Sequence, residues 1–167
     1  YRFMCGGVRN NWRVMSFSER DITRFLAPFG FLRNIGAKMM NKRFIKTCKN
    51  FRPDVVLIGH CDYLKNSSLE KVKELLPETK LVHINVDPIW QEHTVGQIRE
   101  RMHSCDAIFV TTAGERLKEW TTGKNVVGFL PNICDETMEW EDVSASVDFK
   151  YDLFFAGHDC PGDERIA

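Results

Sequence analysis

The feature that most constrains this chain is a set of short, continuous runs of β-branched and other apolar residues. They read DVVLIGH, KLVHINVD, AIFVTT and NVVGFLP, at positions 54–60, 80–87, 107–112 and 125–131. A strand with one face in water alternates apolar and polar residues, whereas a strand covered on both faces is apolar throughout. The runs therefore predict a parallel sheet with helices over both of its faces.

Helical patterns separate these runs. In residues 36–51, apolar side chains at Met40, Phe44 and Cys48 recur every four residues, and the pattern stops before Pro53, as expected for one face of a helix. Three further segments, SSLE (67–70), TVGQ (94–97) and TTAGE (around Thr112–Glu115), have the form of capping boxes that open helices. We expect the first of these helices to run to about Pro77.

Strand–helix alternation of this kind predicts an α/β fold: a Rossmann-like parallel sheet flanked by helices, with right-handed crossovers. Upstream, WRVMSF at 12–17 predicts an earlier strand, and Gly6 and Gly7 predict a helix C-cap. Because the chain begins at Tyr1, inside that predicted helix, we expect a first strand to lie upstream of the sequence.

Composition excludes several classes of partner. Lys+Arg and Asp+Glu both number 23, so there is no basic field to attract nucleic acid. The apolar runs are too short to form a transmembrane segment. The six cysteines occur singly, without a C-x-x-C pair, which favours reduced thiols and a cytoplasmic location over disulfides. No His and Cys have zinc-ligand spacing, so no metal site is expected.

Polar side chains follow each of the four apolar runs. In an open parallel sheet, ligands bind outside the carboxyl ends of the strands, and we expect these side chains to converge there as substrate-binding residues. They are His60 and Asp62, Asn85 and Asp87, Thr111 and Thr112, and Asn132.

Each of these residues also has a purely structural explanation. Thr112 would cap a helix, Asp62 would set a loop, and Asn132 after Pro131 is ordinary turn chemistry. His83, in the middle of its run, is expected to be a hydrogen-bonded core histidine. Asp87 is harder to explain in this way, because a carboxylate at the tip of a strand is well placed to act as a general base.

Common cofactor and nucleophile motifs are missing from these residues. There is no G-x-G-x-x-G after a strand, no G-x-x-x-x-G-K-[ST] and no G-x-S-x-G. A complete dinucleotide site, a P-loop and a hydrolase nucleophile elbow are therefore not expected.

Several longer stretches resemble a known family. VVGFLPNICDETM (126–138) is similar to the turn that closes the N-terminal domain of GT-B glycosyltransferases, and YDLFFAG (151–157) resembles the first strand of their second domain. FRPDVVLIGHCDYL (51–64), HINVDPIW (83–90) and CDAIFVTTAGERLKEW (105–120) resemble the CgeB-type branch of group 1 glycosyltransferases. The resemblance covers residues 12–167 in order. It departs from the pattern at Cys134, where many members read Gly-Val-Asp after the Pro-Asn pair.

The resemblance implies an enzyme that transfers a sugar from a nucleotide-sugar donor to a glycan or small-molecule acceptor. Residues 1–149 would be the N-terminal, acceptor-side Rossmann-like domain, and residues 150–167 the linker and first strand of a truncated C-terminal domain. The donor would be a co-substrate, with no further cofactor and no metal. The fragment alone is expected to be inactive, because the partner domain that binds most of the nucleotide sugar is missing.

The resemblance also implies roles for single residues. Asp87 lies where related enzymes place an acidic residue or a histidine near the acceptor, and it would be the general base of an inverting transfer. Trp90 would stack on the apolar face of a sugar or fill the loop, and Gly157 would let the second domain approach the donor phosphates. Two alternatives remain open: a GT-B-type sugar-nucleotide epimerase, and a non-catalytic α/β ligand-binding module.

Overall fold

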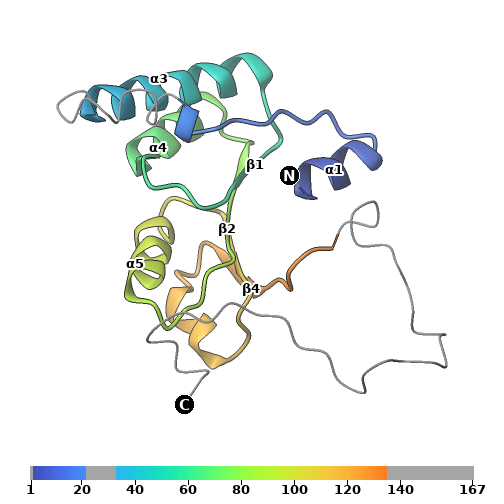
Figure 1. The fold of residues 1–167 in the computed structure, drawn as a ribbon, viewed down its shortest axis with the longest axis vertical. Helices are drawn as coiled ribbons and strands as arrows, with labels where there is room; N and C mark the ends of the chain where they lie inside the picture. Colours follow the sequence, from blue (N-terminus) through green and yellow to red (C-terminus); the bar gives the residue numbers. More distant parts are fainter. Residues whose placement is uncertain (1, 22–32, 135–167) are drawn as a thin grey trace, which may run out of the picture. The chain divides into compact units, whose positions relative to one another are not determined.

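The computed structural model describes residues 2–21 and 33–134, and these contain a parallel sheet with helices packed against it (Figure 1). The sheet has four strands, which are β1 (Val55–Ile58), β2 (Lys80–Asn85), β3 (Ala107–Val110) and β4 (Val126–Phe129). Each strand falls inside one of the four apolar runs, and the predicted α/β, Rossmann-like class is confirmed. By its internal contacts the chain divides into two units, residues 1–133 and 134–167.

The strands lie in the order β1-β2-β3-β4, and all three neighbouring pairs are parallel. Ile58 is in register with His83, and His83 with Ile108, so these side chains leave the same face of the sheet. Because every strand points the same way, their carboxyl ends lie along one edge. That edge is where the connections 59–65 and 86–91 emerge.

The helices of the described residues are α1 (Arg2–Arg9), α3 (Arg33–Phe51), α4 (Asn66–Leu75), α5 (Glu92–Arg101) and the 3₁₀ helix η2 (Glu115–Trp120). The predicted helix over 36–51 is confirmed, and Met40, Phe44 and Cys48 are buried. In Figure 1, α4 and α5 lie on the same side of the sheet. A single core joins this side, with Leu69 from α4, Ile98 from α5 and Trp120 from η2.

All three predicted capping boxes are wrong. α4 begins at Asn66, α5 at Glu92 and η2 at Glu115, and no side chain caps any of these helices. Two of the predicted cap residues, Ser67 and Thr94, lie within the helices that they were expected to open, and a neighbour of Ser67 bonds to another helix. Ser68 lies inside α4, where its hydroxyl donates to Asn41 of α3, and Thr94 is buried inside α5.

Two expectations for the N-terminal segment are also wrong. Gly6 and Gly7 lie within α1 rather than after it. Residues 12–17 form no strand; they run beside α3, where Arg13 donates to the carbonyl of Phe51 and lies over its ring, and Phe17 packs edge-on against Phe44. Of the apolar residues in this segment, Phe17 packs against a helix, whereas Trp12, Val14 and Met15 are 69%, 37% and 51% exposed. The sequence pattern does not distinguish this arrangement from strand pairing.

Within residues 2–21 and 33–134, the sheet is covered on one face and partly exposed on the other. On the face opposite the core, Val55, Leu57 and Val126 are 50%, 47% and 62% exposed. The prediction that the strands are covered on both faces is therefore wrong for the edge strands β1 and β4. None of the helices in residues 2–21 and 33–134 is long and apolar enough to cross a membrane.

Candidate functional site

A histidine held between two carboxylates lies at the carboxyl edge of the sheet. His60 follows β1, and its Nδ1 is 3.1 Å from Oδ2 of Asp87, which follows β2. Its other ring nitrogen, Nε2, is 3.4 Å from Oδ1 of Asp62. The imidazole therefore joins two connections that are neighbours only because β1 and β2 are adjacent in the sheet.

Asp87 is fixed by the strand that precedes it. The side-chain oxygen of Asn85, the last residue of β2, accepts a hydrogen bond of 2.9 Å from the backbone N–H of Asp87. Asn85 itself is buried, whereas the side chain of Asp87 is 35% exposed. The two residues were both predicted at this edge. The buried side chain of Asn85 fixes the turn that follows β2, and the carboxylate of Asp87 lies at the surface.

Asp62 is held from the opposite side by α5. The amide nitrogen of Gln97 donates to Oδ1 of Asp62 over 3.1 Å. This oxygen is the same one that faces His60, so Gln97 and the imidazole share it. The contact joins the segment between β1 and α4 to the helix that follows Asp87.

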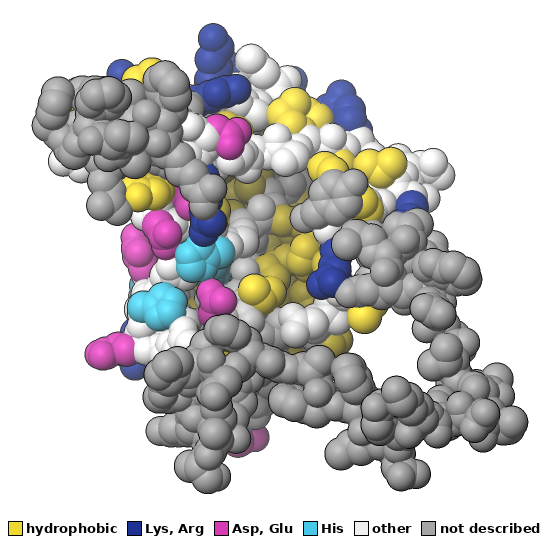
Figure 2. Space-filling model, in the orientation of Figure 1, with side chains coloured by type: hydrophobic (Ala, Val, Ile, Leu, Met, Phe, Trp, Pro, Cys, Tyr) yellow, Lys and Arg dark blue, Asp and Glu magenta, His cyan; other side chains and the backbone are white. Residues whose placement is uncertain are grey.

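The side chains of His60, Asp62 and Asp87 remain accessible. The side chains of His60 and Asp62 are 36% and 50% exposed. Figure 2 shows acidic side chains gathered around histidine side chains on one part of the surface, next to exposed hydrophobic side chains. A solute can therefore reach the pair of His60 and Asp87, while the pair itself is held by its hydrogen bonds.

Trp90, Thr111, Thr112 and Asn132 follow strands at the same edge, but the contacts of His60 with Asp62 and Asp87 do not involve them. Trp90 is 55% exposed in the β2–α5 connection. The hydroxyl of Thr111 donates to the carbonyl of Val86 over 3.2 Å, which ties the end of β3 to the neighbouring connection. Thr112 is half-buried and Asn132, beyond β4, is exposed. Gly157 lies outside the described residues.

His83 is a core residue, as predicted, but it is not hydrogen-bonded. The residue is 2% exposed, and neither ring nitrogen has a partner at hydrogen-bonding distance and angle, although the backbone of Ile58 is near enough to oppose the lowering of the pKa in part. Burial, and then the nearby positive charge of Arg101, lower the pKa of His83 from 6.5 to about 4. The ring is therefore neutral at physiological pH, and it leaves the sheet on the face that carries the core.

The cysteines of the described residues are free thiols. Cys61 lies between His60 and Asp62, which would suit a nucleophile. Burial, and then the negative charge of Glu19, raise the pKa of Cys61 from 9.0 to about 11. Since the thiolate is the reactive form, this raised pKa does not favour nucleophilic chemistry at Cys61.

Within residues 2–21 and 33–134, no group of three His, Cys, Asp or Glu side chains is arranged to hold a metal ion. The centre of the site shows why. Asp62 and Asp87 approach the two different nitrogens of the His60 ring. These nitrogens point in different directions, so the three side chains do not converge on one point.

Sequence reasoning missed four polar residues that shape this region. Glu19, Asn41, Gln97 and Arg101 all bond to the connection that carries His60 and Asp62, or to the start of α4. One of them left a signal: Arg101 follows Thr94 and Ile98 on the buried face of α5, and a charged residue in an apolar stripe calls for a partner. The others have no local signature.

Comparison of the chain with family models, with curated proteins and with solved structures gives no match. Any function of this chain is therefore inferred from the residues of the site and from the motifs of the sequence.

Proposed function

We propose that this chain is the acceptor-side domain of a glycosyltransferase that uses a nucleotide-sugar donor. The observation that carries the proposal is the contact of His60 with Asp87, 3.1 Å apart and partly exposed at the carboxyl edge of a Rossmann-like sheet. This is the edge at which such sheets bind their ligands. The resemblance of residues 51–64, 83–90 and 126–138 to GT-B enzymes supports the choice of reaction.

The pair has the chemistry that sugar transfer requires of this domain. An acceptor hydroxyl must lose its proton as it attacks the anomeric carbon of the donor. In the tautomer that donates its Nδ1 proton to Asp87, the His60 ring has a lone pair on Nε2, which lies beside Oδ1 of Asp62. The acceptor hydroxyl would bind next to this carboxylate and give its proton to Nε2. Asp87 then orients the ring, and both Asp87 and Asp62 stabilise the imidazolium that forms. In this proposal Asp87 acts through His60; direct action of Asp87 as the base, which the sequence predicts, is the alternative.

The surroundings of the pair suit a sugar. Trp90 is exposed in the same connection as Asp87 and offers a flat apolar surface on which a sugar ring stacks. The acceptor bound there is a glycan or a small hydroxyl compound. The diphosphate of the donor would be held mainly by the second domain, through helix N-termini and basic residues.

The test uses the full-length protein, including the second domain. The protein is incubated with a panel of UDP- and GDP-sugars, and release of the nucleoside diphosphate is measured. Water serves as the acceptor where no other acceptor is added. Asp87→Asn and His60→Asn should each lower turnover by roughly 10²-fold, the usual contribution of a positioned base. The affinity for the donor, measured by calorimetry, should stay unchanged.

His103→Asn is the matched control, because His103 is exposed in the turn between α5 and β3, outside the site. It should leave turnover unchanged. Absence of donor cleavage with every nucleotide sugar would refute the proposed reaction. Near-normal turnover of both site variants would refute the role of the pair, and it would favour a retaining mechanism that needs no base.

A further inference from the structure

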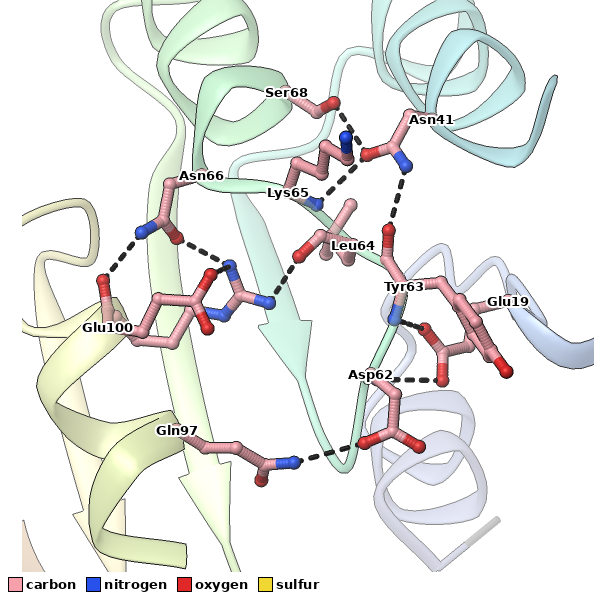
Figure 3. A network of polar contacts seen from close by, with 11 residues as sticks. Glu19, Asn41, Asp62, Tyr63, Leu64, Lys65, Asn66, Ser68, Gln97 and Glu100 are labelled. Atoms are coloured by element: carbon pink, nitrogen blue, oxygen red, sulfur yellow. Dashed lines mark hydrogen bonds and ion pairs between the residues drawn. The ribbon is translucent and has the colours of Figure 1, made fainter. Parts of the chain in front are cut away.

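The connection between β1 and α4, residues 59–65, carries His60 and Asp62, and its backbone is held largely by side chains from elsewhere in the fold. Figure 3 shows Glu19, Asn41 and Gln97 approaching it from different sides. The two carboxylate oxygens of Glu19 accept hydrogen bonds from the backbone N–H groups of Asp62 and Tyr63, each 3.0 Å long. One side chain thus fixes two successive peptide groups directly after His60.

Asn41, in the middle of α3, binds the next part of the connection with both ends of its amide. Its nitrogen donates to the carbonyl of Tyr63 over 2.8 Å, and its oxygen accepts from the backbone N–H of Lys65 over 3.0 Å. The hydroxyl of Ser68 donates to the same oxygen. Asn41 therefore fixes both the end of the connection and the start of α4.

Arg101, in the last turn of α5, completes the set. Its guanidinium group donates to the carbonyl of Leu64 and to the side-chain oxygen of Asn66. With the contacts of Glu19 and Asn41, the backbone of Asp62–Lys65 is bonded at five polar groups: three N–H groups and two carbonyls. Such groups in a connection usually bond to water or to their own turn.

The three side chains are buried to an unusual degree for their types. Glu19, Asn41 and Arg101 are 6%, 7% and 3% exposed. Burying a carboxylate or a guanidinium group is costly unless it is fully bonded, and replacement by apolar residues is often neutral or stabilising. A connection that only had to join β1 to α4 would not require these residues. Their common target is the segment that holds His60 beside Asp87.

We propose that Glu19, Asn41 and Arg101 are positioning residues, which hold the β1–α4 connection so that His60 stays between Asp62 and Asp87. The consequence for catalysis rests on the proposed function; the consequence for the geometry of the connection does not. The two can therefore be tested apart.

The geometry is tested by NMR on Glu19→Gln in the full chain. Glutamine keeps the shape of the side chain but offers one acceptor oxygen where two N–H groups must be accepted. We expect the amides of Asp62 and Tyr63 to exchange with solvent at least tenfold faster in the variant. The ring signals of His60 should move, because its contact with Asp87 loosens. Core amides such as that of Ile84 should exchange at an unchanged rate.

Two further variants keep the test decisive. Glu115→Gln is the matched control, since the side chain of Glu115 is 87% exposed and lies far along the chain in η2; it should change none of these signals. Arg101→Lys keeps the positive charge but lacks the two-pronged donor that reaches Leu64 and Asn66. It should also shift the His60 ring signals, and it serves as the second variant if Glu19→Gln fails to fold.

In the full-length enzyme, Glu19→Gln should lower kcat at least tenfold and leave KM for the donor unchanged, at temperatures where the variant is fully folded. A merely structural residue would lower the melting temperature without this effect on kcat. Unchanged exchange at Asp62 and Tyr63, or unchanged His60 signals in folded variants, would overturn the inference. If the NMR changes appear but the wild type cleaves no nucleotide sugar, the positioning role stands and the proposed function fails.

Discussion

The buried, unbonded imidazole of His83 makes folding stability depend on pH in a way that one substitution should remove. The pKa of His83 is lowered from 6.5 to about 4 in the folded chain, mainly by burial. The unfolded chain therefore binds a proton between these two values while the folded chain does not. Stability contributed by the neutral ring is complete above pH 6.5 and is lost as the pH falls toward 4.

The size of the effect follows from the two pKa values. A difference of one pKa unit corresponds to about 1.4 kcal/mol. For the values of 6.5 and about 4, the free energy of unfolding should fall by about 2 kcal/mol between pH 7.5 and pH 5 through this residue alone. Leucine has nearly the volume of histidine and no polar atom, so His83→Leu should remove this loss.

The assay is urea denaturation of the wild type and of His83→Leu at pH 7.5 and pH 5. The quantity of interest is the difference between the two proteins, because it removes the contributions of all groups other than residue 83. At pH 7.5 the variant should be as stable as the wild type or more so, because two unsatisfied ring nitrogens are removed from the core. At pH 5 the difference in the free energy of unfolding between the variant and the wild type should be about 2 kcal/mol larger than at pH 7.5, in favour of the variant.

His103→Gln is the control, since His103 is exposed and should leave the pH dependence as it is. If His83→Leu loses stability between pH 7.5 and pH 5 as the wild type does, the ring is not the group that titrates. The reasoning from burial would then be refuted. A large loss of stability at pH 7.5 would show instead that His83 has a bonding partner that the geometry does not reveal.

Two further predictions concern stability alone. Gly114, before η2, has φ of 130° and ψ of 178°, a conformation that strains any residue with a Cβ. Gly114→Ala should therefore lower the free energy of unfolding by about 1–3 kcal/mol in urea denaturation. Gly96→Ala in α5 should be neutral or stabilise by up to about 1 kcal/mol, and equal effects of the two variants would contradict strain at Gly114. Trp120 is 1% exposed in the core, whereas Trp12 is 69% exposed. Trp120→Ala should therefore lower the free energy of unfolding by about 3–5 kcal/mol, and Trp12→Ala should lower it little. A mild effect of Trp120→Ala would place Trp120 outside the core.

The sequence by itself determined the sheet and its main helix. Continuous apolar runs with β-branched residues predicted all four strands, and their alternation with helices predicted parallel pairing. The stripe of Met40, Phe44 and Cys48 predicted the buried face of α3. These features depend on the chain's own periodicity and on burial, which are both local properties of a sequence. The edge of the sheet that carries the candidate site could be predicted as well, because the carboxyl ends of parallel strands lie along the same edge.

Only the tertiary structure decided how the polar residues are used. Ser68 lies in the SSLE motif that predicted a helix cap, yet its hydroxyl bonds to Asn41, which lies 27 residues earlier. His60 and Asp87 are also 27 residues apart, and they meet because β1 and β2 are neighbours in register. A polar side chain carries no local mark of the partner that it will find across the fold. The partner is set by strand order and by the helix that packs nearby, and these are properties of the assembled domain.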